Sequence, residues 1–311
     1  MIELRRLSKR YGEAVVVDAL EVTVAAGKVT GFLGPNGSGK STTMRMILGL
    51  ARPTSGCALI DGRAYGQLIE PLRTVGAVVD AKGVHPGRSA RAHLLGLARY
   101  NGIAGRRVDE VLGLVGLADV AHRRVGTYSL GMGQRLGIAG ALLGDPGVLV
   151  FDEPVNGLDT DGVRWVRELM RSLAAQGRTV FVSSHLMSEM QLTADHLVVI
   201  GRGRLIADAP IGELLAASRR TTVRLRSPDL QGLAALHARL VAEGHPAQRQ
   251  DPDLLLVPGA DVEHVGRLAH AAGLLLHELG VFQPSLEEAY VDMTRGAVEY
   301  TTQEVGDADR G

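Results

Sequence analysis

Residues 34–42 read Gly-Pro-Asn-Gly-Ser-Gly-Lys-Ser-Thr, and this stretch gives the strongest indication of the fold. It follows the pattern G-x-x-x-x-G-K-S of a phosphate-binding loop. The apolar run at 28–33 predicts a buried strand, and residues 43–50 carry apolar side chains at helical spacing. Because the motif requires a strand before the loop and a helix after it, the sequence predicts a nucleotide site here. An accidental glycine-rich turn is the alternative, and the flanking elements disfavour it.

The loop also indicates which groups meet the phosphates. Its glycines let backbone N–H groups turn inward, and the helix N-terminus adds the positive end of its dipole. We expect Lys40 to reach the β- and γ-phosphates and Ser41 to hold Mg²⁺. The full predicted cradle is Gly34, Pro35, Asn36, Gly37, Ser38, Gly39, Lys40, Ser41 and Thr42.

The composition restricts the class of protein. A chain of 311 residues with 45% hydrophobic residues and a mean hydropathy of +0.09 suits one or two domains with a sizeable core. The formal net charge of zero disfavours a nucleic-acid partner. The single cysteine, Cys57, cannot form an internal disulfide and favours a reducing compartment. No run of 18 apolar residues occurs, so we expect no membrane span.

A second apolar strand is predicted at 147–151, and it ends in Asp152 and Glu153. A buried strand of this kind aims its last side chains at the mouth of a parallel sheet, where ligands bind. We expect Asp152 to hold Mg²⁺ and Glu153 to act as the general base on an attacking water. A solvated turn is the weaker alternative, because the strand is so apolar.

His185 follows another apolar strand, at 178–184. A lone histidine at a strand end is usually structural, but here it stands where a sensor of the γ-phosphate is useful.

Ser129 is predicted to cap the helix that follows it, and with Gly131 it offers a hydroxyl, N–H groups and a helix dipole to an anion. An ordinary capped helix is the alternative. Tyr11 lies upstream of the loop and could stack on a purine or merely fill space.

The remaining pattern indicates an α/β chain. Residues 2–33 form short β-like pieces, 54–66 resemble a hairpin and 71–80 end in a strand closed by Asp80. Residues 89–122 look helical and are expected to form a patch inserted into the α/β core. A final hairpin is predicted at 195–208.

Together these motifs resemble the ATP-binding subunits of ABC transporters, over about residues 1–218. Tyr11 resembles the A-loop aromatic, residues 34–42 the Walker A loop, 128–134 the signature loop, 148–153 Walker B, 156–159 the D-loop and His185 the H-loop switch. All six in this order make chance very improbable. The resemblance implies the P-loop ABC ATPase core, with an antiparallel β subdomain and an inserted helical subdomain.

Two departures from the family pattern stand out. Asp80 occupies the position where the family has the Q-loop glutamine, and a carboxylate there still ligates Mg²⁺ but changes the charge of the site. The signature loop reads YSLGMGQ, so Leu130 replaces a glycine and Met132 the usual glutamine. Such variants resemble the branch that serves drug- and antibiotic-resistance exporters.

The resemblance also implies partners and a place. Two cassettes face head to tail in this family, so Ser129 of one copy completes the site built on Lys40 of the other, and a homodimer is expected. ATP closes the pair, and hydrolysis reopens it. The motion drives a separate polytopic permease through the surface loops near residues 83–91, which places the chain at the cytoplasmic face of the membrane.

The last ninety residues form a different region. The predicted order of elements is βαββαβ over 219–295, which suggests a small ferredoxin-like α+β accessory domain, followed by a polar tail at 296–311. Such a domain could stabilise a dimer, bind a regulator or only pack. Its histidines (His237, His245, His264, His270 and His277) lack the compact spacing of a metal site, and we expect none.

Two other functions remain open from the sequence. A soluble ABC ATPase acting on ribosomes or nucleic acid is one, although its usual second cassette or coiled-coil insertion is missing here. An unrelated phosphate-loop kinase or GTPase is the other, and the signature loop with Glu153 and His185 speaks against it.

Overall fold

The structure is a computed structural model that describes residues 1–79, 83–217, 222–282, 286, 287 and 290. It divides the chain into two compact units, the first Met1–Pro210 and the second Ile211–Gly311. The boundary falls where the last strand of the first unit ends. Helix α8 (Ile211–Ala217) therefore groups with the second unit.

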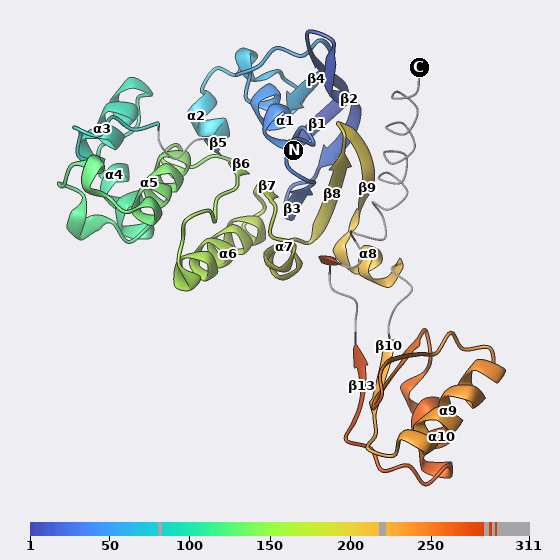
Figure 1. The fold of residues 1–311 in the computed structure, drawn as a ribbon. Coiled ribbons are helices and arrows are strands. Elements are labelled where there is room, and N and C mark those ends of the chain that lie inside the picture. The colour runs from blue at the N-terminus through green and yellow to red at the C-terminus, as the bar shows by residue number, and fades with distance from the viewer. Residues whose placement is uncertain (80–82, 218–221, 283–285, 288–289, 291–311) are drawn as a thin grey trace, which may run out of the picture. The chain divides into compact units, whose positions relative to one another are not determined.

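A six-stranded sheet forms the centre of the first unit (Figure 1). Five neighbouring strands are parallel and the last one is antiparallel. In spatial order they are β5 (Val75–Val78), β6 (Val148–Asp152), β7 (Thr179–Ser184), β3 (Val29–Leu33), β8 (His196–Gly201) and β9 (Arg204–Pro210). Every residue of β3 and β7 is buried, as expected for parallel strands covered on both faces.

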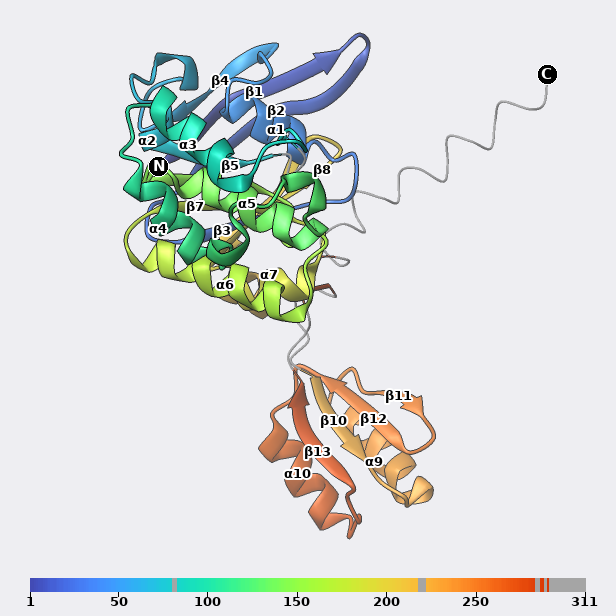
Figure 2. The same ribbon diagram turned by 90° about the vertical axis from the view of Figure 1, so that its left-hand side faces the viewer.

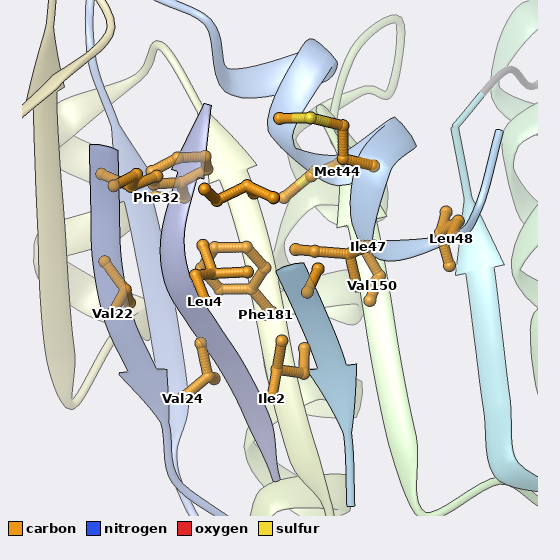
Figure 3. Packing of buried hydrophobic residues seen from close by; sticks show 14 of the residues in the cluster. Ile2, Leu4, Val22, Val24, Phe32, Met44, Ile47, Leu48, Val150 and Phe181 are labelled. Carbon is orange, nitrogen blue, oxygen red and sulfur yellow. The ribbon is translucent and has the colours of Figure 1, made fainter. Parts of the chain in front are cut away.

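An antiparallel sheet packs over the central one. Its strands are β2 (Ala14–Val24), β1 (Ile2–Tyr11) and β4 (Ser55–Ile60), in that order. Figure 3 shows apolar side chains of β1 and β2 meeting Met44 and Ile47 of α1 (Lys40–Ile47) and the rings of Phe32 and Phe181. Those two ring centroids are 5.0 Å apart. This core fixes α1, and so the loop before it, against the central sheet.

One sequence expectation differs here. Residues 54–66 were expected as a hairpin and contribute one named strand, β4, which pairs with β1, while the return of the chain is limited to a single antiparallel bridge between Ile60 and Arg63. The turn at Asp61 and Gly62 leads instead into the short 3₁₀ helix η1 (Tyr65–Gln67).

Helices inserted between β5 and β6 gather at the end of the unit away from β8 and β9 (Figures 1 and 2). They are α3 (Ala90–Tyr100), α4 (Arg106–Leu114) and α5 (Leu130–Leu142), with the short η2 (Ala118–Val120) and η3 (Val125–Thr127) between them. The short α2 (Pro71–Thr74) leads into β5. Helices α6 (Thr160–Ala175) and α7 (Met187–Thr193) pack against β3 and each other. The predicted helical patch is thus confirmed as an insertion into an α/β core.

The second unit has its own core. Its elements are β10 (Thr222–Arg226), α9 (Leu230–Ala242), β11 (Gln248–Asp251), β12 (Leu254–Pro258), α10 (Val262–Ala271) and β13 (Glu278–Phe282). The sheet order is β11-β12-β10-β13 and every pairing is antiparallel. Apolar residues of β10, β12, α9 and α10 form one cluster. The βαββαβ order is the predicted one, whereas the expected tail at 296–311 lies outside the described residues.

None of the helices that the structure describes combines the length and the apolar character needed to cross a bilayer.

Candidate functional site

The phosphate loop joins β3 to α1 and depends on glycine. Gly39 has a φ of 104°, in the left-handed region that L side chains rarely adopt. A Cβ added at Gly39 would lie 2.7 Å from the carbonyl oxygen of Val16. The loop therefore passes directly against β2, and only glycine fits at this point.

Lys40 is buried at the start of α1. Its Nζ donates hydrogen bonds to the carbonyl oxygens of Gly34, at 2.6 Å, and Pro35, at 3.2 Å. Burial lowers the pKa of Lys40, and the nearby carboxylates of Glu153 and Asp152 oppose that shift. A desolvated ammonium group held over its own loop is stabilised by an arriving anion, such as a phosphate.

The two carboxylates at the end of β6 are fixed by Ser183 of β7. The Ser183 hydroxyl donates to Asp152 Oδ1 at 2.5 Å and accepts the backbone N–H of Glu153 at 2.9 Å. Glu153 has a φ of 52°, a conformation that costs a non-glycine residue about 1–3 kcal/mol. Ser183 thus holds both acids in place. Sequence reasoning missed it, although two serines ending an apolar strand are a detectable signal.

Glu153 and His185 form a pair at the mouth of the sheet. His185 Nδ1 lies 2.8 Å from Glu153 Oε2, with about half of the histidine side chain exposed. Both residues line a pocket of about 390 Å³ together with Asn36, Lys40, Ser41 and Asn156. The structure therefore brings the predicted Lys40, Glu153 and His185 into one place.

The oxygen groups around this pocket suit a magnesium ion. Ser41 lies in its wall and carries a hydroxyl group, and the carboxylate of Asp152 is close enough to Lys40 to influence the pKa of that lysine. Hydroxyl and carboxylate oxygens are the hard ligands that Mg²⁺ prefers. The third predicted ligand, Asp80, lies outside the described residues.

Ser129 lies at a different pocket. It caps α5, and its hydroxyl accepts the backbone N–H of Met132 at 3.2 Å. The pocket beside it has a volume of about 310 Å³ and is lined by Val84, Pro86, Leu130 and others, none of which lines the first pocket. Gly131 packs near Leu158, where an added Cβ would lie 3.3 Å from a leucine methyl group.

Tyr11, at the end of β1, is also not among the residues lining the first pocket. Its side chain is exposed, and Lys9 Nζ lies 4.8 Å from the ring centroid. The ring is therefore accessible on its unit's surface, with a cation over it.

Comparisons with known proteins give matches in both units. The family model described as "ABC transporter" matches residues 17–156, which include the phosphate loop and the end of β6. A second model, a domain of unknown function, matches residues 221–287 of the second unit.

Two curated relatives and one solved structure illustrate the similarity. The bacitracin transport ATP-binding protein BcrA of Bacillus licheniformis is 43% identical over 71% of this chain and 73% of its own. The lantibiotic transport ATP-binding protein SrtF of Streptococcus pyogenes is 35% identical over 67% of this chain and 90% of its own. A solved ATP-binding subunit of an ABC transporter aligns with a TM-score of 0.64 and 26% identity, over 70% of this chain and 92% of that one.

Proposed function

Because the chain belongs to the ATP-binding proteins of ABC transporters, we propose that two copies of it close around ATP and drive export of an antibiotic or similar amphipathic compound. Proteins of this family are ATPases that dimerise and work with membrane permeases.

The separation of the two pockets carries the proposal. Lys40, Glu153 and His185 share one pocket, whereas Ser129 lines another with no residue in common. The N-terminus of α5, which Ser129 caps, carries the positive end of the helix dipole and therefore favours an anion. A second copy, placed head to tail, supplies the γ-phosphate that this cap suits.

We assign the roles within the first pocket as follows. Lys40 leaves its loop carbonyls and binds the β- and γ-phosphates. Ser41 and Asp152 hold Mg²⁺, which neutralises charge on the phosphate oxygens. His185 turns from Glu153 to the γ-phosphate. Glu153, released from that pair, accepts the proton of the attacking water.

The assignments extend along the chain. Residues 1–218 form the nucleotide-binding domain and 219–295 an accessory domain, with a polar tail at 296–311. Tyr11 stacks on the adenine from the edge of the antiparallel sheet. The segment near residues 83–91 faces a separate permease, so the chain works at the cytoplasmic face of the membrane.

Two observations support an antibiotic-like cargo. Relatives named for bacitracin and lantibiotic transport share 43% and 35% identity with this chain over 71% and 67% of its length. The signature loop carries Leu130 and Met132, which resemble the exporter branch.

Mixing two inactive variants tests the composite site. Lys40→Ala and Ser129→Arg are each expected to abolish ATP hydrolysis. A mixed dimer holds one intact site, built from Lys40 of one copy and Ser129 of the other. After mixing in equal amounts, random pairing of a symmetric dimer restores about a quarter of wild-type turnover. No recovery, with both variants folded and able to exchange partners, contradicts a site shared between chains.

Purification from gently solubilised native membranes tests the permease. Mass spectrometry is expected to find a polytopic membrane protein at a fixed ratio to this chain. Ribosomal proteins or nucleic acid in its place would move the function to the soluble class of ABC ATPases.

A further inference from the structure

The second unit brings together two histidines and a glutamate that are apart in the sequence. Glu243 caps the C-terminal end of α9, His245 follows two residues later and His264 lies in the first turn of α10. One ligand atom from each side chain lies within 4.8 Å of the other two. The spacing along the chain hides this cluster, since the 18 residues between the two histidines include the hairpin of β11 and β12.

Contacts within the cluster already orient its groups. His264 Nε2 lies 2.8 Å from Glu243 Oε2, and the ring centroids of the two histidines are 5.6 Å apart. The other carboxylate oxygen, Glu243 Oε1, accepts a hydrogen bond from Arg239 Nε at 3.1 Å. One oxygen is thus held by Arg239 while the other contacts His264. This is the outer-shell support typical of metal ligands.

The helix ends give a second argument, independent of the distances. A carboxylate is disfavoured at the C-terminus of a helix and an imidazolium near an N-terminus, because each meets the like end of the dipole. Glu243 and His264 occupy these two unfavourable positions. A cation between them adds to the compensation that Arg239 already gives Glu243. It also uses His264 as a neutral imidazole, the form that suits its helix end.

The turn between Glu243 and His245 reverses the direction of the chain. Gly244 has a φ of 87°, and the backbone N–H of His245 returns to the carbonyl of Leu240 in α9. The chain therefore reverses directly after Glu243 and presents His245 beside it. All three side chains are partly exposed, so an ion in solution reaches them.

From this arrangement we propose that Glu243, His245 and His264 bind a zinc ion, with water as the fourth ligand. Zinc takes imidazole nitrogen and carboxylate oxygen at about 2.0–2.2 Å in a tetrahedron, which separates neighbouring ligand atoms by about 3.3 Å. The three ligand atoms already lie within 4.8 Å of one another, and side-chain rotations bring them to this separation. The ion replaces the proton between His264 Nε2 and Glu243 Oε2, and His264 Nδ1 takes up that proton. The site would tie the end of α9 to the start of α10.

Calorimetric titration of the full chain with zinc chloride, without nucleotide, tests the proposal. Wild type is expected to bind zinc at a site that both His264→Gln and His245→Gln weaken at least about tenfold. His270→Gln is the matched control, because His270 is an exposed histidine on the same helix and outside the cluster. It is expected to bind zinc like wild type. Circular dichroism establishes that each variant is folded. The use of two ligand variants keeps the test valid if one of them does not fold.

Cobalt provides a readout that incidental surface binding does not reproduce. Co²⁺ in the wild-type chain is expected to give the intense visible absorption of a four-coordinate site, lost in both ligand variants and kept in His270→Gln. Absence of zinc binding in wild type, or equal zinc affinity in wild type and both ligand variants, overturns the proposal. A spectrum that shows only the weak absorption of six-coordinate cobalt also overturns the proposal. None of these results depends on ATP hydrolysis, so they test the zinc site independently of the proposed transport function.

Discussion

Each unit of this chain contains a glutamate–histidine pair with the same separation. His185 Nδ1 lies 2.8 Å from Glu153 Oε2 in the first unit, and His264 Nε2 lies 2.8 Å from Glu243 Oε2 in the second. The surroundings differ. The first pair faces a phosphate loop and a buried lysine, whereas the second faces another histidine and an arginine. The same two side chains therefore suit phosphate chemistry in one place and metal binding in the other.

The sheets explain why only the first pair sits in a nucleotide pocket. In the first unit β3, β6 and β7 run parallel, so their carboxyl ends bring the loop, the acids and His185 to one edge. In the second unit every pairing is antiparallel, and consecutive ends point to opposite edges. Its histidines meet through helix ends instead. Matched changes in the two units test this contrast.

The largest expected effect is on hydrolysis. Glu153→Gln keeps the shape of the site but removes the base, so ATP turnover is expected to fall at least about 100-fold while ATP binding remains. Glu263→Gln removes an exposed carboxylate from α10 and is expected to leave turnover unchanged. A phosphate-release assay with a nucleotide-binding measurement checks both variants. Wild-type turnover in Glu153→Gln removes this residue as the base.

Backbone conformation gives the next contrast. Gly39→Ala introduces a side chain at a φ of 104°, against the Val16 carbonyl, and is expected to weaken ATP binding at least about tenfold, which corresponds to about 1.4 kcal/mol. Gly259→Ala meets open space at a φ of 71°. It is expected to cost about 1–2 kcal/mol of stability and no ATP affinity. Titration with a fluorescent ATP analogue and chemical denaturation separate the two effects. Equal ATP affinity in both variants contradicts the proposal that residues 34–42 form the phosphate cradle.

Each unit also has an exposed aromatic ring beneath a cation. Lys9 Nζ lies 4.8 Å from the Tyr11 ring, and the Arg224 guanidinium lies 4.5 Å from that of Phe282. Stacking on a base is worth about 1–3 kcal/mol, so Tyr11→Ala is expected to weaken ATP binding about tenfold and Tyr11→Trp to retain it. Phe282→Ala is the control and is expected to bind ATP like wild type. Unchanged affinity in Tyr11→Ala would show that the ring only covers the strand end.

The smallest contrast concerns two buried serines. Ser183 connects Asp152 and Glu153, and Ser227 connects the Leu275 carbonyl and the Asp229 N–H. Each alanine variant removes two hydrogen bonds from partly buried groups and is expected to lose about 1–3 kcal/mol of unfolding free energy. Only Ser183→Ala is expected to lower turnover as well, by a few-fold. Denaturant unfolding and steady-state kinetics, with Ser183→Thr as a conservative rescue, check this. Equal turnover in the two alanine variants would make Ser183 purely structural.

The sequence predicted much of the nucleotide site because local chemistry determines it. A phosphate loop needs glycine at fixed positions and a lysine at its end, so residues 34–42 carry their own geometry. The apolar strand ending in Asp152 and Glu153 likewise shows which side chains reach the sheet edge. The order βαββαβ of the second unit follows from the alternation of apolar patterns along the chain.

Other features could not be predicted, because they depend on which segments become neighbours. Ser183 acts on Asp152 and Glu153 only because β6 and β7 pair in register. Residues 54–66 give one strand, since β1 offers β4 a longer partner than a local hairpin does. The sequence of a single segment reveals neither pairing.

The class of ligand follows from the sequence alone, because phosphate recognition is encoded in one continuous loop. Which distant groups share a pocket depends on the tertiary structure. It placed Lys40, Glu153 and His185 together and Ser129 apart, and it joined Glu243, His245 and His264 across two helix ends. The physical reason is that backbone conformation is a local property, whereas a composite site depends on strand pairing and helix packing between residues far apart in the chain.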